Sequence, residues 1–489
     1  MTQPVSSQPD QPEQHHQAQP LPNKHEERVS HTSIFALLAL VGLLLILFTG
    51  LLIGNLPQVT QPDGTQQTLT KQGTALATST VTPTPLLAPG GNAAASLQFP
   101  AGHAVVYETQ DNKIYVTSAN GSLPQLVNTP GYSYNSAVVP ILTPSGDLLY
   151  SGDSGVWSTG IFGGTAKQIV TFPADQVITS LALSRDGSML AWSTEPQNGV
   201  GSVKLYAGSL SDAMVSPLGE AALVYQQPAE DCPCLRVFSF LGGSGKQADN
   251  TLLLTDDRGD HRAVRYGLWS FDLGQRDSAQ PQPLLAEEEQ QGPLALAPEG
   301  NMLLYSSYEG VVPAPTDGST PEDIDALSYA NSLYVAPIGG KPLVLNPAQV
   351  ILPAQHELSN SAEYHWVATP LFSPDGHTLI YVEFSSDALA PFSRHSALYT
   401  VQMKGVGGQL RAGNPQLLAT TTAQYIEPGT ESGAWLDNST LTFYADRALY
   451  AVNIHTGAVA SIAQTETYAR VLAVVKQEGL KGPEKSSVV

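Results

Sequence analysis

Three short stretches of this 489-residue sequence carry side chains in an order that could support catalysis or adhesion. Gly152-Asp-Ser-Gly155 copies the residues around a chymotrypsin-type nucleophile, but no histidine-bearing counterpart segment accompanies it, so we interpret it as a turn. Gly243-Ser-Gly245 lacks the strand–elbow–helix context that a hydrolase nucleophile needs. Arg258-Gly-Asp260 matches an adhesion tripeptide, and a match of three residues is frequent by chance. We therefore predict no catalytic residue.

The histidines are scattered rather than clustered. Four of them lie in the polar N-terminal stretch: His15, His16, His25 and His31. Two adjacent and two distant imidazoles do not form a defined ligand spacing. His356 and His365 lie near Glu357 and Glu363, where a polar loop is the simpler interpretation than a metal site. Phosphate-binding, EF-hand, HExxH and dinucleotide motifs are absent from the sequence. We predict no metal site and no cofactor.

The only two cysteines are Cys232 and Cys234, in a Cys-Pro-Cys sequence. Two ligands are too few for a structural zinc site. On the outer side of a membrane a local disulfide between them is a reasonable expectation. Its small ring would be strained and redox-labile. Two free thiols are the alternative.

The composition excludes several classes of protein. Charged residues make up 13% of the chain, against about 25% in an ordinary soluble protein. Together with 43 glycines and 37 prolines, this argues against helical bundles and favours a turn-rich β protein. The chain has 22 Lys and Arg against 43 Asp and Glu, a net charge of -21. Nucleic acid and anionic membrane surfaces need clustered Lys and Arg, so we predict no nucleic-acid partner.

The segment from Ser33 to Gly54 is 22 residues long and has no ionisable side chain. As a helix it spans about 33 Å, enough to cross a hydrocarbon core of about 30 Å. A cleaved signal peptide is the rival interpretation, but 32 mostly polar residues precede the segment. We therefore predict one uncleaved transmembrane helix, residues 33–54. Lys24 and Arg28 before it place the N-terminus in the cytoplasm.

The flanking segments are low in complexity. Residues 1–32 contain six Gln and five Pro, which predicts a disordered cytoplasmic tail. Residues 55–96 contain nine Thr and five Pro, which predicts an extended stalk. Residues 477–489 are predicted to be a disordered C-terminal tail. The protein would thus be a single-pass protein of the cell membrane, with residues 97–476 outside the cell.

An aliphatic–aromatic pair recurs seven times in residues 97–476. The copies are Ile114-Tyr115, Val156-Trp157, Leu205-Tyr206, Leu268-Trp269, Leu333-Tyr334, Leu398-Tyr399 and Leu449-Tyr450. Most copies are preceded by a tight turn between two apolar runs, most clearly in Phe372-Ser-Pro-Asp-Gly-His-Thr-Leu-Ile-Tyr381. Asp-Gly supplies the positive φ of a hairpin, and Leu-x-Tyr is typical of a half-buried strand. Four strands per repeat of 40–65 residues indicate a β-propeller.

The Ser373-Pro-Asp-Gly-x-x-Leu-x-Tyr381 element resembles the WD40-like, TolB-type propeller repeat (PD40) of bacterial envelope proteins. The resemblance covers most of residues 100–475 in pattern only, and the copy around Gly242–Asn250 is degenerate. It implies an all-β propeller that serves as a binding platform, and it supplies no catalytic residues. We predict a seven-bladed β-propeller preceded by one transmembrane helix, with six or eight blades as alternatives.

Ring closure can be predicted from the two ends of the repeats. The first repeat begins at Ala104-Val-Val-Tyr107 with no strand before it, and Arg470-Val-Leu-Ala-Val-Val475 is left over after the last. Adding this last strand to the first blade as its innermost strand would complete seven blades and remove an open sheet edge. Long insertions should form loops on the ring faces: 225–250, 310–331, 346–366 and 385–396.

These features predict a membrane-anchored, extracytoplasmic platform that binds a protein, peptide or glycan. A cationic or neutral partner would suit the charge of -19 that remains for the propeller after the tail and stalk are subtracted. One alternative is a propeller-type enzyme, a glycan lyase or hydrolase, with its residues dispersed over several blades. The other is a transmembrane sensor or regulator, for which a tail of 32 residues is short. The binding residues remain unassigned at this stage.

Overall fold

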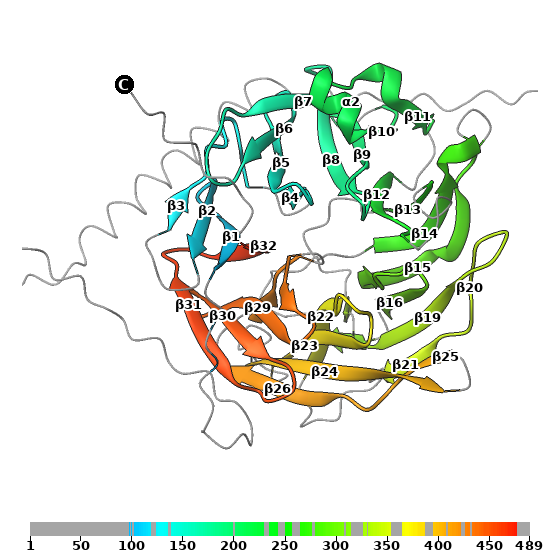
Figure 1. The fold of residues 1–489 in the computed structure, drawn as a ribbon. Coiled ribbons are helices and arrows are strands. Elements are labelled where there is room, and N and C mark those ends of the chain that lie inside the picture. Colours follow the sequence, from blue (N-terminus) through cyan, green and yellow to red (C-terminus); the bar gives the residue numbers. More distant parts are fainter. Residues whose placement is uncertain are drawn as a thin grey trace, which may run out of the picture. The chain divides into compact units, whose positions relative to one another are not determined.

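The described part of the chain is a seven-bladed β-propeller. The computed structural model describes residues 97, 99 and 102–476, apart from internal gaps; the longest gaps are 243–249, 257–264, 314–325, 354–363 and 387–394. All of these residues belong to one compact unit, Val81–Val489. Figure 1 shows the blades around a common centre. The predicted all-β fold and the count of seven blades are confirmed.

Blades 1 to 3 are separate four-stranded antiparallel sheets. Blade 1 contains β1 (His103–Thr109), β2 (Lys113–Ser118), β3 (Gln125–Leu126) and β32 (Ala469–Lys476). Blade 2 contains β4 (Ile141–Leu142), β5 (Asp147–Gly152), β6 (Gly155–Gly160) and β7 (Lys167–Thr171). Blade 3 contains β8 (Gln176–Leu183), β9 (Met189–Pro196), β10 (Lys204–Ser209) and β11 (Leu223–Gln226). The short helices α2 (Leu210–Val215) and η1 (Glu220–Ala222) lie between β10 and β11.

Blades 4 and 5 share one long strand, β15 (Gln282–Leu296), which pairs with β14 on one side and β16 on the other. Blade 4 also contains β12 (Leu235–Phe240), β13 (Thr251–Asp256) and β14 (Arg265–Asp272), which η2 (Leu273–Gln275) follows. Blade 5 also contains β16 (Met302–Ser307), β19 (Leu333–Gly339), β20 (Val344–Leu345) and β21 (Gln349–Leu352). The last strand of blade 4 therefore continues into the first strand of blade 5 without an intervening loop.

Blades 6 and 7 each have one divided strand. Blade 6 contains β22 (Tyr364–Phe372), β23 (Thr378–Ser386), β24 (His395–Val406), β25 (Gln409–Ala412) and β26 (Gln416–Thr421). Blade 7 contains β27 (Ile426–Pro428), β28 (Trp435–Asp437), β29 (Thr440–Ala445), β30 (Ala448–Asn453) and β31 (Val459–Gln464). In blade 7 the innermost strand is interrupted between β27 and β28.

The ring closes through β32, as predicted. This strand pairs antiparallel with β1 along its whole length, and one bulge leaves Leu472 without a ladder partner. The interrupted strand of blade 7 covers this bulge: the Thr430 hydroxyl donates to the Leu472 carbonyl at 2.9 Å, and the Thr430 amide donates to the Val471 carbonyl at 3.0 Å. The seam between blades 7 and 1 therefore satisfies the carbonyl that the bulge exposes.

Seven hydrophobic clusters fill the spaces between neighbouring blades of the described chain, one for each space. The second strand of a blade contributes side chains to two of these clusters, because successive side chains point to opposite faces of the sheet. In β5, for example, Leu148 and Tyr150 face blade 1, whereas Leu149 faces blade 3. This is why the sequence there is continuously apolar rather than alternating.

The aromatic residue of each repeat lies on the third strand of its blade, as expected. In five blades it stacks on an aromatic residue of the second strand with ring centroids 5.1–5.6 Å apart: Tyr107–Tyr115, Trp192–Tyr206, Tyr305–Tyr334, Tyr381–Tyr399 and Phe443–Tyr450. In blades 2 to 7 a bulge in the pairing with the outer strand falls directly between the aliphatic and the aromatic residue. The bulge increases the local twist of the outer edge.

The Ser-Pro-Asp-Gly turn is held by its own side chains. In blade 6 the Ser373 hydroxyl donates to Asp375 at 2.6 Å and accepts from the Thr378 amide at 2.9 Å. Gly376 follows with φ +69°. Blade 3 repeats the arrangement with Ser184 and Gly187, whose φ is +74°. Serine thus closes the turn and glycine supplies its left-handed residue.

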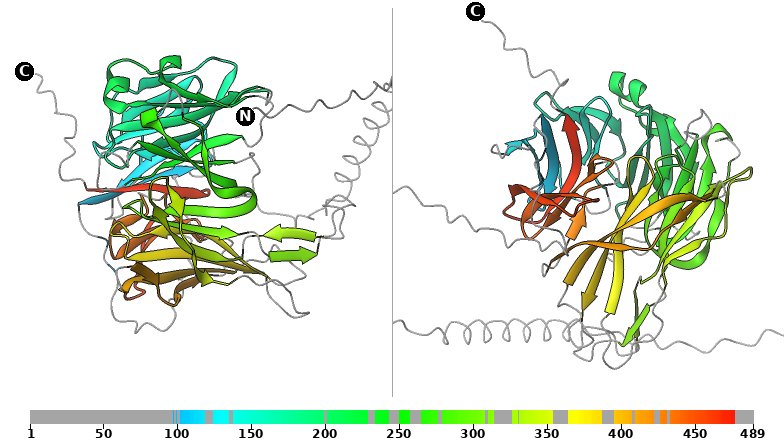
Figure 2. Two further views of the ribbon diagram at one scale, coloured as in Figure 1. Left: turned by 90° about the vertical axis from the view of Figure 1, so that its right-hand side faces the viewer. Right: turned by 60° about the horizontal axis from the view of Figure 1, so that its bottom comes forward.

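Three of the predicted insertions contain strands of their own. The prediction of a loop over 225–250 is wrong at β12, which is the innermost strand of blade 4; its turn motif has degenerated, so the repeat was not visible there. The 346–366 segment contains β21 and the start of β22. The 310–331 segment contains a ribbon of β17 (Gly310–Pro313) and β18 (Ala326–Tyr329), which stands away from the blades in Figure 2.

Within the described residues no helix is long and apolar enough to cross a membrane. The predicted transmembrane segment Ser33–Gly54 lies outside the described residues, as do the tail 1–32, the stalk 55–96 and the C-terminal segment 477–489. The transmembrane helix therefore stays a prediction.

Removal of residues 468–489 is expected to abolish cooperative unfolding of the propeller. The deletion removes β32 with its buried Val471, Leu472 and Val475, which costs about 5 kcal/mol or more of burial and opens an edge of β1. The control ends the chain after Lys476 and keeps β32. Thermal unfolding of both variants measures the effect, and an unchanged melting temperature after the longer deletion would show that β32 does not close the ring.

Alanine at the turn glycines of blades 6 and 3 should separate backbone strain from steric clash. A Cβ at Gly376 meets nothing closer than 3.8 Å, so Gly376→Ala should cost about 1 kcal/mol for its positive φ. A Cβ at Gly187 lies 2.7 Å from Cδ of the rigid Pro144 ring, so Gly187→Ala should cost about 2–3 kcal/mol. Urea unfolding measures both, and equal costs would contradict the steric argument.

Candidate functional site: the central channel

A cavity of about 780 Å³ lies where the innermost strands meet, and every blade contributes to its lining. We call this cavity and its lining the central channel. The lining consists mainly of apolar residues from the innermost strands and of the tight turns that follow them. Four charged residues interrupt it: Arg185, Arg236, Glu427 and Arg470.

Irregular backbone faces the central channel on several blades. The innermost strands of blades 3, 4 and 6 are bulged at Thr179, Phe238 and Thr369–Pro370, and all of these residues line the cavity. Thr369 has φ +47°, an outlying conformation for a β-branched residue. Strain of this kind persists only where the surrounding structure enforces it, and it concentrates at functional sites.

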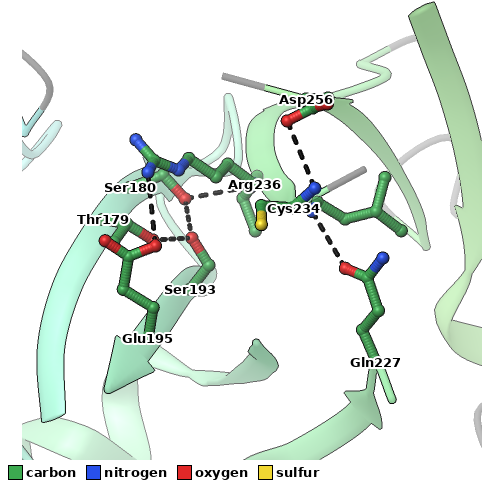
Figure 3. A network of polar contacts seen from close by, with 10 residues as sticks. Thr179, Ser180, Ser193, Glu195, Gln227, Cys234, Arg236 and Asp256 are labelled. Carbon is green, nitrogen blue, oxygen red and sulfur yellow. Dashed lines mark hydrogen bonds and ion pairs between the residues drawn. The ribbon is translucent and has the colours of Figure 1, made fainter. Parts of the chain in front are cut away.

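Arg236 is held in place by a neighbouring blade. It is the second residue of β12 in blade 4, and it is 7% exposed. Its Nη2 lies 3.3 Å from Glu195 Oε2 at the end of β9 in blade 3 (Figure 3). Because the partner belongs to another blade, this ion pair fixes the guanidinium and also joins the two blades at the channel.

A cluster of hydroxyl groups lies beside this ion pair (Figure 3). The Ser193 hydroxyl is hydrogen bonded to Thr179 Oγ1 at 2.8 Å and to Ser180 Oγ at 2.5 Å. Ser180 Oγ also accepts from the Val237 amide at 2.9 Å. The cluster therefore ties the bulge of β8 to the innermost strand of the next blade.

The start of β12 is fixed by two further side chains. The Leu235 amide donates to Gln227 Oε1 at 3.0 Å, and the Cys234 amide donates to Asp256 Oδ1 at 3.2 Å. Cys232 lies outside the described residues, so the disulfide with Cys234 stays a prediction. The two contacts set the position of Arg236, which follows directly.

Arg470 occupies the corresponding place on blade 1. It is the second residue of β32, it is 9% exposed, and it forms an ion pair with Glu108 of β1, which is fully buried. Tyr132 donates a hydrogen bond to the other oxygen of Glu108. The Arg470 guanidinium also lies over the Tyr134 ring, 5.3 Å from its centroid. A charged residue of the channel is thus built into the seam that closes the ring.

Glu427 is the acidic member of the lining. It is the second residue of β27 in blade 7 and accepts a hydrogen bond from Tyr468, which precedes β32. Burial raises the pKa of Glu427, although Tyr468 and Arg470 oppose the shift. Burial likewise raises the pKa of Glu108 against the opposing effects of Arg470 and Tyr132. Two carboxyl groups with elevated pKa values therefore share one arginine at this seam.

Arg185 belongs to the opposite part of the lining. It lies in the turn of blade 3, and its Nη1 donates to the carbonyl oxygen of Pro298 in the turn of blade 5. The turns also pack against each other, since Pro298 Cδ lies 3.8 Å from the position of a Cβ at Gly376. The two ends of the channel therefore differ, with tight turns at one end and the starts of the innermost strands at the other.

The structure does not bring the motifs considered from sequence to this channel. Gly152 and Gly155 pair across a two-residue hairpin between β5 and β6, which confirms the turn. The Gly243 and Arg258 motifs, and His356, lie outside the described residues. His365 lies in β22, where only its backbone is described.

The residues that line the channel were missed at the sequence level. Arg236, Glu427 and Arg470 share one signal: each is the second residue of an innermost strand, after a buried Leu, Ile or Ala. That signal can be read only once the innermost strands are known, and the sequence does not show that β12 and β27 are innermost strands.

Comparisons with known proteins find similar solved structures but no matching family. No protein-family model matches the chain, and no curated protein matches it. Three similar solved structures represent the matches. The periplasmic gluconolactonase PpgL of Pseudomonas aeruginosa is 12% identical, with 76% of this chain and 99% of that chain covered and a TM-score of 0.44. TolB of Acinetobacter baumannii is 15% identical, with 65% of each chain covered and a TM-score of 0.32. The β-propeller domain of Cps50 (Swd1) from Myceliophteria thermophila is 10% identical, with 68% and 88% covered and a TM-score of 0.38.

Propeller proteins, TolB among them, thus appear among the similar structures, as the repeat resemblance implied. At these identities and TM-scores the likeness carries no argument about a site or an activity. The seven blades are established by the strand pairing itself.

Glu427→Gln should stabilise the protein more at high pH than at low pH. Because burial raises its pKa, the folded state binds the Glu427 proton more tightly than the unfolded state. This contribution to stability is present below the unfolded pKa of about 4.3 and is lost as the pH rises through the folded pKa. Gln cannot titrate, so the difference in unfolding free energy between variant and wild type should grow from about pH 5 to about pH 8.

Urea unfolding across this pH range measures that difference. The control is Glu466→Gln, which removes one exposed carboxylate two residues from Tyr468. If the difference in unfolding free energy between Glu427→Gln and wild type stays constant or shrinks as the pH rises, the pKa of Glu427 is not raised in the folded protein.

Proposed function

We propose that this chain is a membrane-anchored, extracytoplasmic propeller that binds a protein, peptide or glycan at its central channel. The observation that carries the proposal is the cavity of about 780 Å³ to which all seven blades contribute. Its lining is mostly apolar, with a few fixed polar groups, and this is the usual make-up of a binding site.

The positions of the polar groups support binding at this place. Arg236 and Arg470 are each held by a glutamate, so their guanidinium groups are oriented before any ligand arrives. A preoriented group loses little conformational entropy when a ligand binds. The outlying φ of Thr369 on the same lining is a second sign that the channel is shaped for a purpose other than packing.

Anchoring rests on the sequence alone. The 22 uncharged residues Ser33–Gly54 would form the helix, and residues 55–96 would hold the propeller away from the membrane. Lys24 and Arg28 would keep the N-terminus in the cytoplasm.

Photocrosslinking from the channel of the full-length protein in native membranes tests this proposal. Phe238→benzoylphenylalanine places the crosslinker on the channel lining. We expect discrete adducts from this position, and we expect the protein to stay in the membrane fraction after an alkaline wash.

The matched control carries the same crosslinker at Leu417, which is 41% exposed on the outer strand of blade 6. Equal adducts from both positions, or none from Phe238, would contradict binding at the channel. Release of the protein by the alkaline wash would contradict the anchor and leave the channel result to be judged separately.

A further inference from the structure

The charges at the end of the central channel where the innermost strands begin do not balance. Arg236 is paired there with Glu195. Arg470 is paired with Glu108. Glu427 lies at the same strand position in blade 7 and adds a third carboxyl group. Arg470 attracts this carboxyl group electrostatically but forms its ion pair with Glu108. Two positive groups therefore face three negative ones, and this end of the channel is acidic when Glu427 is ionised.

The Glu427 carboxyl group has one oxygen open to the channel. Glu427 is partly buried and belongs to the lining. Tyr468 donates a hydrogen bond to Oε2, and no donor among the described residues reaches Oε1. Oε1 is not enclosed by protein, so a ligand atom can approach it from the cavity. A carboxylate accepts hydrogen bonds on both oxygens, and Oε1 is therefore available to a donor on a ligand.

An ammonium group is the donor that suits this oxygen best. It forms a charge-assisted hydrogen bond, which is about twice as strong as a neutral one, and it also balances the charge of the carboxylate. A hydroxyl or amide donor would leave that charge unbalanced. A guanidinium group binds a carboxylate best through both oxygens, and Tyr468 already occupies Oε2 of Glu427. A single open oxygen thus favours a primary ammonium group over a guanidinium group.

The rest of the lining sets the orientation of such a ligand. Arg185 lies at the opposite end of the channel, where it donates to a carbonyl oxygen and forms no ion pair with the described residues. A cation is therefore repelled from that end and attracted to Glu427. The wall between the two ends is mainly apolar, with Phe238 and Leu294 among its side chains. An apolar body attached to the ammonium group would fill this part of the cavity.

We propose that the central channel binds a primary ammonium group carried on an apolar body, with the ammonium group donating to Oε1 of Glu427. This inference rests on the proposed function, because it names the ligand class for the same channel. The amino terminus of a peptide and the side chain of a lysine both supply this chemistry, and the experiment distinguishes them.

Titration of Glu427 gives this binding a characteristic pH dependence. Burial raises its pKa and Glu108 raises it further, whereas Tyr468 and Arg470 oppose the shift. Tyr444, which lies opposite Glu427 in the strand ladder, has a raised pKa of its own and stays neutral. Because an ammonium group binds the ionised carboxylate, binding should tighten as the pH rises from about 5 to about 8. A lysine ammonium group remains charged over this range, since its pKa is about 10.4.

Isothermal titration calorimetry with the full-length protein in detergent micelles tests the inference. One probe is leucyl-alanyl-leucinamide, whose only cation is its amino terminus. The other is N-acetyl-leucyl-lysyl-leucinamide, whose only cation is the lysine side chain. The matched partner of each probe carries an acetyl group on that nitrogen. We expect at least one cationic probe to bind at least tenfold more tightly than its acetylated partner, and the probe that does so identifies the source of the ammonium group.

One channel variant and one control sharpen the result. Glu427→Gln removes the charge and keeps an acceptor for Tyr468. It should weaken binding of the cationic probe at least tenfold, leave the acetylated partner unchanged and abolish the pH dependence. Glu466→Gln removes an exposed carboxylate that is not part of the lining, and it should leave affinity unchanged. The paired probes and the pH series on the wild-type protein keep the test decisive if Glu427→Gln does not fold.

Four results would each overturn the inference: equal affinity for both cationic probes and their acetylated partners, no binding of any probe, affinity for the lysine probe that fails to rise with pH, or unchanged affinity in Glu427→Gln. Channel adducts from Phe238 alongside any of these results would leave the proposed function standing with another class of ligand. Absence of those adducts would remove both.

Discussion

The pairing of β1 with β32 joins the two ends of a chain whose hydrophobic clusters otherwise connect only blades that follow one another in sequence. Each of the seven hydrophobic clusters lies between two adjacent blades, so no cluster spans the ring by itself. The cluster between blades 7 and 1 forms only when β32 is in place, because Val471 belongs to it. The central channel likewise has its full lining only in the closed ring, since Arg470 comes from the closing strand. Stability and the candidate site thus depend on the same strand.

That shared dependence explains why charged side chains lie at the seam between blades 7 and 1. A fully buried glutamate is costly unless it is paired, and Glu108 is paired with Arg470 and Tyr132. A purely apolar seam would pack as well, but it would present no charge to the channel. The polar groups at the seam therefore have two effects. They fix the register in which β32 pairs with β1, and they set part of the charge of the central channel. A second ion pair of this kind, Arg236–Glu195, joins blade 3 to blade 4 beside the channel.

The sequence predicts the fold in much greater detail than the site. The repeat of a turn glycine and a Leu-x-Tyr strand has a local physical cause, namely a left-handed turn residue and a half-buried strand, so it is visible wherever it recurs. Closure followed from counting strands at the two ends. The innermost strand of blade 4 was hidden, because its turn around Gly242 had lost the motif. The channel residues were hidden for a different reason: Arg236, Glu427 and Arg470 are far apart in sequence and meet only through the ring. No local pattern records which residues share a strand position on different blades.

Closure by the last strand also has a mechanical consequence. Tension applied to the residues before His103 would enter the ring at β1, the strand flanked by β2 on one side and β32 on the other. Pulling β1 along its own axis loads the hydrogen bonds of both ladders in parallel, rather than one after another as in the peeling of an edge strand. A chain that entered through an outer strand such as β3, with two residues, would offer far less resistance. The topology thus makes β1 a strand well suited to bear a pulling force applied through the residues before it.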